Sequence, residues 1–174
     1  MKKRTRAREL TLQFLYQLDL RGDELYEEAG ATLRAEERDV ETLRFATRLV
    51  EGVWLNWDEI EKTIQAVAQN WNIARMAVID RNVLRLGTFE LLHCPDIPPK
   101  VAVNEAIELG KRFSTANSGA FINGILDKIM NRKPALPQDA AARDEQAART
   151  APQPEGETEG TPETDERPET ARQG

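Results

Sequence analysis

The residues that could perform catalysis or bind a metal are few in this sequence. His93 is the only histidine and Cys94 the only cysteine, and the two are neighbours at the predicted end of a helix. Zinc sites use four ligands, or three with a water, so this pair cannot form one. Adjacent helical side chains point about 100° apart, which also keeps His93 from activating Cys94. The sequence therefore predicts no enzyme, no metal site and no cofactor.

A basic run at the N-terminus suits a different chemistry, the binding of phosphate. Guanidinium groups bind phosphate oxygens in a bidentate manner, so an arginine-rich helix start is suited to contact with RNA or DNA. The alternative is a solvated basic end that only aids solubility. The candidate phosphate-binding residues are Lys2, Lys3, Arg4, Arg6 and Arg8.

Phe121 does not fit the apolar pattern of its own helix. Apolar residues at steps of three and four from Ile122 to Met130 form one stripe, and Phe121 lies about 110° from its centre. It falls in the first turn, behind a predicted N-cap at Asn117 or Ser118, where free backbone N–H groups attract anions. An aromatic ring at that position can stack a nucleotide base beside a bound phosphate. The alternative is that Phe121 only widens the apolar stripe.

Leu12 and Tyr16 lie roughly opposite the core stripe of the first predicted helix. Apolar side chains on a second helix face suggest a protein contact, and they would also suit a homodimer that hides the RNA surface. The alternative is a large helical bundle that buries them. The core stripe itself consists of Ala7, Leu10, Thr11, Phe14 and Leu18.

The elements that carry these residues are predicted to be helices, because apolar residues recur at helical spacing and no convincing strand is present. The segment Ile79–His93 is apolar around nearly its whole circumference, which is typical of a helix at the centre of a bundle. Asn56 and Glu59 suggest a capping box, and the three tryptophans are expected to anchor packing between helices. The predicted helices span Met1–Leu20, a weaker segment within Arg21–Asp39, Val40–Leu55, Ile60 to Trp71, Ile79–His93, Val103–Phe113 and Ile122–Met130.

The chain changes in composition at Pro134. Residues 134–174 contain six of the nine prolines, no aromatic residue, and ten acidic against four basic residues. Such a segment buries too little to offset its ordering entropy, so we expect one helical domain at 1–133 and a disordered acidic tail at 134–174. The tail could transiently cover the basic N-terminus. The absence of a long apolar run, a secretory pattern and a second cysteine is typical of a cytoplasmic protein with no membrane contact.

Several blocks of this sequence resemble the bacterial transcription antitermination factor NusB family across roughly residues 4–131. These blocks are Arg6–Glu9 (RARE), Asp80–Arg81 with Leu84–Arg85 and Glu90–Leu91, Pro99–Leu109 (which contains NEAIEL) and Phe121–Asp127 (FINGILD). The resemblance implies an all-α fold of about seven helices in two small subdomains. It also implies a non-enzymatic protein that binds the single-stranded boxA element of nascent ribosomal RNA together with the ribosomal protein NusE. That assembly supports processive transcription by RNA polymerase.

The family's RNA site corresponds here to Arg4, Arg6, Arg8, Asn117 and Phe121, with Lys2 and Lys3 close by. Tyr16 and Asp80 match positions on the side that faces NusE, and an acidic Asp80 suits a basic ribosomal protein. The sequence departs from the family at Thr5, which interrupts the arginine cluster, and at Ala120, where a lysine can occur. Asn117 stands where an aspartate can occur, and a neutral side chain repels phosphate less.

Two other functions are compatible with the pattern. A helical module that binds only protein would lose no activity when Arg4, Arg6 and Arg8 are replaced. A stand-alone relative of the N-terminal RNA-binding domain of rRNA cytosine methyltransferases is the other alternative, although this sequence leaves no room for a Rossmann-like cofactor domain.

Overall fold

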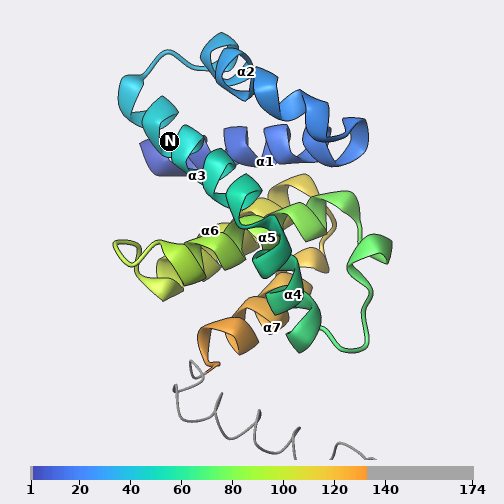
Figure 1. The fold of residues 1–174 in the computed structure, drawn as a ribbon. Coiled ribbons are helices and arrows are strands. Elements are labelled where there is room, and N and C mark those ends of the chain that lie inside the picture. Colours follow the sequence, from blue (N-terminus) through green and yellow to red (C-terminus); the bar gives the residue numbers. More distant parts are fainter. Residues whose placement is uncertain (1, 133–174) are drawn as a thin grey trace, which may run out of the picture. The chain divides into compact units, whose positions relative to one another are not determined.

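The computed structural model describes residues 2–132, and these residues form helices without any strand (Figure 1). The all-α fold class is thereby confirmed. The predicted disordered tail, 134–174, lies outside the described residues. The α-helices are α1 (Lys3–Arg21), α2 (Ala29–Glu36), α3 (Val40–Leu55), α4 (Trp57–Val67), α5 (Val78–His93), α6 (Pro99–Phe113) and α7 (Ser118–Met130), and the 3₁₀ helices are η1 (Asp23–Glu28) and η2 (Ile73–Arg75).

Local signals explain where the first helices begin and end. Gly22 follows α1 with a φ of 100°, a left-handed conformation that glycine adopts without steric cost. Asp39 caps α3, because its carboxylate accepts hydrogen bonds from the Thr42 backbone N–H at 2.9 Å and from the Thr42 hydroxyl at 2.8 Å. The predicted span Val40–Leu55 is the observed span of α3.

The predicted capping box at Asn56 is wrong. Asn56 makes no side-chain cap bond to α4, since its Nδ2 instead donates to the Gly52 carbonyl at 2.8 Å. The helix that was expected to reach Trp71 ends at Val67. Beyond it, the amide of Gln65 donates to the carbonyls of Ala68 and Trp71 and holds the loop in place.

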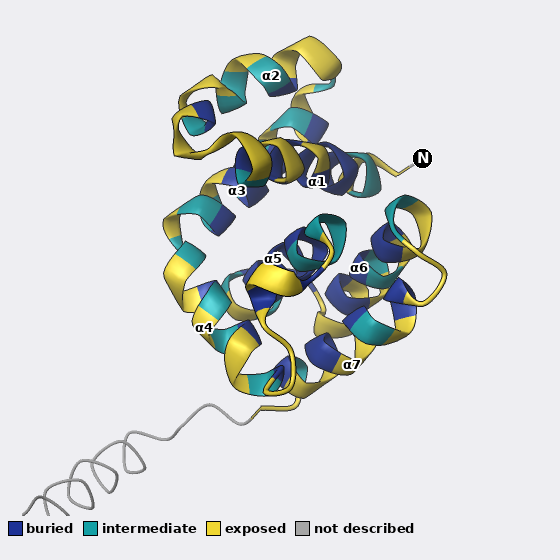
Figure 2. Ribbon diagram, turned by 90° about the vertical axis from the view of Figure 1, so that its right-hand side faces the viewer, coloured by how far each residue is buried: buried dark blue, intermediate teal, exposed yellow. Residues whose placement is uncertain are grey.

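Helix α5 is the centre of the bundle, as its apolar circumference predicts. It contacts α1, α3, α4, α6 and α7. Helices α1, α2 and α3 pack together on one side of it, and α4, α6 and α7 lie on the other (Figure 1). Buried residues face inward from both groups (Figure 2). The core therefore runs through both halves, and the contacts join residues 1–133 into one compact unit.

Helices α6 and α7 form the expected pair of amphipathic helices. Gly110 lets α6 approach α7 closely, because a Cβ at this position would collide with the Ile122 side chain. The end of α6 leads through Ser114–Asn117 directly into the first turn of α7. Asn117 is exposed in this turn, while Phe121 is half-buried and packs partly against the core.

Candidate functional site

The N-terminal cations lie at the surface, but most of them are paired with carboxylates. Lys2 is exposed and makes no ion pair within residues 2–132. The ammonium of Lys3 donates to Glu41 at 2.7 Å and lies 3.1 Å from Asp39. The hydrogen bonds to Glu41 and then Asp39 raise the pKa of Lys3. A phosphate must therefore compete with these two carboxylates for Lys3.

Arg4 and Arg6 are also partly engaged. Arg4 lies 3.8 Å from the carboxylate of Asp96, and its guanidinium stands 4.7 Å from the centre of the Phe45 ring. Arg6 lies 3.5 Å from Glu9 and 3.6 Å from Glu37. A guanidinium has five N–H donors, so both arginines keep donors free for a phosphate.

Arg8 is not a surface residue, and the expectation that it contacts RNA is corrected here. Its side chain is only 2% exposed, and Nε and Nη2 donate to the Glu90 carboxylate at 2.9 and 2.6 Å. Glu90 lies on α5 and is itself 1% exposed. Because the apolar stripe of α1 packs inward, Arg8 at its edge faces α5. The buried carboxylate of Glu90 on α5 pairs with the charge of Arg8.

Leu12 is likewise buried, at 2% exposure, so its expected role on a partner surface is wrong. Helix α1 packs against α3, α5, α2 and η1, which together leave little of its circumference free. Tyr16 does reach the surface, with 38% of it exposed. Leu20 lies one turn further along the same face and is 56% exposed, a residue that the sequence analysis did not single out.

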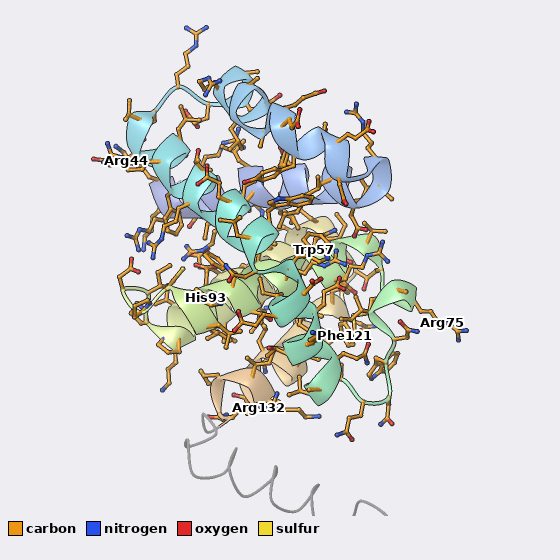
Figure 3. The ribbon with its side chains drawn as sticks, viewed as in Figure 1. Arg44, Trp57, Arg75, His93, Phe121 and Arg132 are labelled. Carbon is orange, nitrogen blue, oxygen red and sulfur yellow. The ribbon has the colours of Figure 1, made fainter. Side chains whose placement is uncertain are left out.

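Phe121 lies beside Trp71 in a shallow hollow at the start of α7. The two rings meet edge to face, with their centroids 5.6 Å apart, and Trp71 is 59% exposed. The hollow measures about 230 Å³, and Arg75, Asp80 and Asn117 also line it. Figure 3 shows Phe121 and Arg75 on the part of the molecule formed by α4, α7 and η2. The structure thus brings Phe121, Asn117 and Asp80 together from different parts of the chain.

Two polar side chains of this hollow have unused hydrogen-bonding capacity. Asn117 makes no cap hydrogen bond to α7, although the sequence favours it as an N-cap. Asp80 has one buried carboxylate oxygen, Oδ1, without a hydrogen-bond partner in the described part of the chain. Asp80 lines the same hollow as Phe121 and Trp71. It belongs to α5, which contacts α1.

Glu9 links the N-terminal cations on α1 with the last turn of α6. Glu9 is almost fully buried, and its carboxylate contacts both Arg6 and Arg112, a residue in the last turn of α6. The next residues along the chain form the turn that carries Asn117. Arg6 and Arg112 therefore share the Glu9 carboxylate, although Glu9 and Arg112 are 103 positions apart in the sequence.

Three residues near the candidate site do not stand out in the sequence: Trp71, Arg75 and Arg112. Trp71 is expected to anchor packing between helices, yet it follows a polar segment, and an aromatic residue in a polar loop is a signal of surface exposure. Arg112 belongs to the polar face of a helix, where a cation is ordinary. Only the fold shows that this face adjoins the start of α1.

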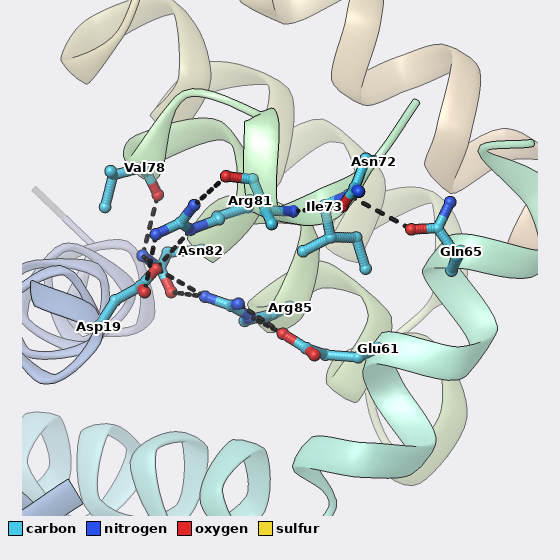
Figure 4. Close-up of polar contacts among 10 residues, drawn as sticks. Asp19, Glu61, Gln65, Asn72, Ile73, Val78, Arg81, Asn82 and Arg85 are labelled. Atoms are coloured by element: carbon cyan, nitrogen blue, oxygen red, sulfur yellow. Dashed lines mark hydrogen bonds and ion pairs between the residues drawn. The ribbon is translucent and has the colours of Figure 1, made fainter. Parts of the chain in front are cut away.

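A polar network next to Tyr16 fixes α1 against α5 and α4 (Figure 4). The Asp19 carboxylate accepts hydrogen bonds from Arg81 at 2.6 Å and from Arg85 at 2.8 Å, and Arg85 also pairs with Glu61. Burial disfavours the ionised form of Asp19, but the bonds from Arg81 and Arg85 outweigh it and lower the pKa. The network holds the helix face with Tyr16 and Leu20 in a fixed orientation.

The remaining candidate groups for catalysis are separated. Cys94 is buried, and burial raises the pKa of its thiol. His93 instead contacts Glu59, at 2.9 Å from Nε2. Within residues 2–132 no group of three or more His, Cys, Asp or Glu side chains is placed to hold a metal ion. No helix in the same range is long and apolar enough to cross a membrane.

Comparison with known proteins decides the family. A profile described as the NusB family matches residues 5–131. The chain belongs to the NusB family. The transcription antitermination protein NusB of Myxococcus xanthus is 47% identical over 133 residues, which cover 74% of this chain and 95% of that protein. The protein of the same name from Syntrophus aciditrophicus is 44% identical over 129 residues, 74% of this chain and 80% of that one.

Solved NusB structures share the fold. T. maritima NusB matches with a TM-score of 0.68 and 39% identity, covering 75% of this chain and 93% of that one. A structure of antitermination factors NusB and NusE in complex with double-stranded RNA matches with a TM-score of 0.67 and 27% identity, covering 75% and 97%. The resemblance found in the NEAIEL and FINGILD blocks is thereby confirmed.

Proposed function

We propose that this chain is a transcription antitermination factor that binds boxA-like single-stranded RNA together with the ribosomal protein NusE, within an RNA polymerase antitermination complex in the cytoplasm. The observation that carries the proposal is the aromatic pair of Trp71 and Phe121 beside the unengaged Asn117. Family membership and the NusB–NusE–RNA complex support it. The chain acts as an adaptor and not as an enzyme.

The RNA surface has two parts with different tasks. Lys2, Lys3, Arg4 and Arg6 attract and position the phosphates, and Arg112 extends this basic strip toward α7. The rings of Phe121 and Trp71 stack a base, which is worth about 1–3 kcal/mol per base. Asn117 and Asp80 offer polar groups to the base edge. Arg8 has no part in this surface because it is buried.

The NusE surface is formed by the exposed face of α1 and the start of α5. Tyr16 and Leu20 supply apolar contact area, and the neighbouring Asp19–Arg81–Arg85 network keeps that face rigid. Asp80 lines the aromatic hollow. It also belongs to α5, the helix whose Arg81 is hydrogen-bonded to Asp19 on α1. NusE bound at this position would extend the RNA surface, which makes RNA and NusE binding cooperative.

Fluorescence anisotropy with a labelled boxA-like RNA tests the proposal. The wild-type protein, Phe121→Ala and the control Leu92→Ala, which removes an exposed apolar side chain elsewhere, are measured at two salt concentrations, with and without NusE. We expect salt-sensitive binding that NusE strengthens and that only Phe121→Ala weakens. A duplex of the same sequence is a further arm, because the solved complex contains double-stranded RNA.

The same measurements distinguish the proposed function from the alternatives. If NusE binds but no RNA responds under any condition, the chain is a module that binds protein only. If RNA binds equally well to the wild type and to Phe121→Ala, the aromatic hollow is not the base-binding site.

Deleting residues 134–174 tests the role of the acidic tail. If residues 1–133 are the functional domain, the deletion should leave specific RNA binding intact. If the tail covers the basic strip, the deletion should also tighten binding to unrelated RNA.

A further inference from the structure

A second hollow lies where α3 passes into α4, and the proposed RNA surface does not use it. Its volume is about 660 Å³. The hollow shares no lining residue with the hollow of Phe121 and Trp71. It is lined by Asp23, Trp54, Leu55, Asn56, Trp57, Asp58 and Glu59.

Aromatic rings form the walls of this hollow. Tyr26 stacks on one face of Trp54, with centroids 4.5 Å apart and an angle of 12° between the planes. Trp57 stands edge-on to Trp54 at 6.4 Å and 64°. The guanidinium of Arg85 covers one face of Trp57, 4.2 Å from the ring centre (Figure 3 labels Trp57). Both tryptophans are half-buried against the core, and the part of each ring that remains open lines the hollow.

The charged groups of the hollow are all acidic. Asp23 and Asp58 are exposed and make no ion pair within residues 2–132, and Glu59 pairs with His93. No lysine or arginine lines the hollow. Carboxylates next to indole rings attract a cation, because the face of a tryptophan ring is the strongest cation–π partner among side chains. The same carboxylates repel phosphate, which excludes nucleic acid from this position.

Leu55 indicates that the ligand also has an apolar part. Its side chain is 77% exposed on the rim, next to the two tryptophans. Small exposed apolar groups are ordinary, but here an exposed leucine, two indole rings and three carboxylates share one hollow. A free metal ion would not use Leu55 or the rings, whereas a peptide with a basic and an apolar side chain would use all of them.

We propose that this hollow binds an arginine or lysine side chain, with an adjacent apolar residue, from a basic segment of a partner protein. The cationic head lies against Trp54 and Trp57 and between the carboxylates, while the apolar neighbour covers Leu55. The site gives this chain a protein contact that is separate from its RNA surface. The proposal stands whether or not RNA binds at Phe121.

Nuclear magnetic resonance on the ¹⁵N-labelled full chain tests the site, because the three tryptophans give three indole N–H signals and Trp71 is an internal control. The probe is the blocked dipeptide acetyl-Leu-Arg-amide, and the control is the same dipeptide with neutral citrulline. We expect the Trp54 and Trp57 signals to shift saturably with the arginine peptide, while the Trp71 signal stays in place and the citrulline peptide has little effect.

Charge variants complete the test. Neutralising the rim with Asp23→Asn, Asp58→Asn and Glu59→Gln together should weaken binding of the arginine peptide by roughly tenfold. The matched control removes the same charge elsewhere through Glu36→Gln, Glu108→Gln and Asp127→Asn, all at exposed positions, and should keep wild-type binding. Equal shifts with citrulline, equal shifts at Trp71, or equal weakening by both triple variants would each overturn the proposal. An unchanged Trp71 signal shows that a variant is folded.

Discussion

The guanidinium of Arg8 and the carboxylate of Glu90 form an ion pair that is almost completely enclosed, with side-chain exposures of 2% and 1%. The pair joins α1 to the central helix α5. Burial raises the pKa of Glu90, while the bonds from Arg8 favour its ionised form. Arg8 belongs to the basic run in sequence and to the core in structure.

We expect Arg8→Ala to lower the free energy of unfolding by about 3–5 kcal/mol, because it leaves the Glu90 carboxylate buried without a partner. The double variant Arg8→Met, Glu90→Leu should recover much of that loss, since it removes both charges. Urea denaturation followed by circular dichroism measures both variants. Lys2→Ala serves as the control in the same basic run, and a loss of stability as large as that of Arg8→Ala would contradict this division between core and surface.

Trp71→Ala is expected to weaken RNA binding by about 1–3 kcal/mol, in the range of one stacked base, while NusE binding stays unchanged. The reason is that Trp71 supports the Phe121 ring at its edge and is itself 59% exposed. Because Trp71 lies in a loop, its loss should cost little stability. Anisotropy titrations with RNA and with NusE separate the two effects, and a parallel loss of NusE binding would show a folding defect instead.

Glu41→Gln is expected to tighten RNA binding at low salt. Glu41 accepts a hydrogen bond from Lys3 at 2.7 Å, so its neutralisation removes one of the two carboxylates that compete with a phosphate for Lys3, the other being Asp39. Lys2 pairs with no carboxylate within residues 2–132, and Lys2→Ala should therefore reduce the slope of log K against log salt by about 0.7, the value for one phosphate contact with a single strand. If the affinity for RNA is unchanged by Glu41→Gln at all salt concentrations, Glu41 does not compete with RNA for Lys3.

Acid should destabilise this protein between about pH 4 and pH 2. Hydrogen bonds from Arg48 lower the pKa of Asp96 to about 2, and bonds from Thr42, with Lys3, lower that of Asp39 to about 2, both from 3.8. A carboxyl with a depressed pKa in the folded state stabilises the fold above its ordinary pKa and loses this contribution as the pH falls through the depressed value. Thermal unfolding at pH 5, 3 and 2 measures the loss.

The variant Asp96→Asn provides the comparison for the acid prediction. It lacks the titrating group at the Arg48 contact, so its melting temperature should fall less steeply between pH 4 and pH 2 than that of the wild type. An identical pH dependence in both proteins would mean that the bond between Arg48 and Asp96 adds nothing to stability, as is common for exposed ion pairs.

The helices could be predicted because their signals are local. The strong apolar stripe and the Asp39 cap fix α3, and the continuous apolar circumference of Ile79–His93 predicts the central place of α5. Arg8 and Leu12 could not be placed, because what buries them is remote in sequence. Glu90 lies 82 positions from Arg8, and the segment that includes η1 and α2 has too weak a pattern to predict its packing on α1.

Of the two aromatic residues in the hollow, only Phe121 stands out in the sequence. Phe121 is conspicuous because it departs from the stripe of α7, and the helical period alone places it away from the stripe's centre, in agreement with its half-buried position. Its partner Trp71 is separated from it by 50 positions, and no periodicity links a loop residue to a helix. The Glu9–Arg112 contact is similarly remote and joins two regions that look unrelated in the sequence.

The amide of Gln65 has a consequence for binding rates and for entropy. Its amide nitrogen, Nε2, donates to the carbonyls of Ala68 and Trp71, and its oxygen, Oε1, accepts from the Ile73 backbone N–H at 3.3 Å. One side chain thus fastens three points of the loop that carries Trp71. The loop backbone that carries Trp71 is therefore ordered before a ligand arrives, so binding at Trp71, as proposed, loses little backbone conformational freedom. A preorganised platform of this kind favours fast capture of a transcript during the short time it is exposed behind a moving polymerase.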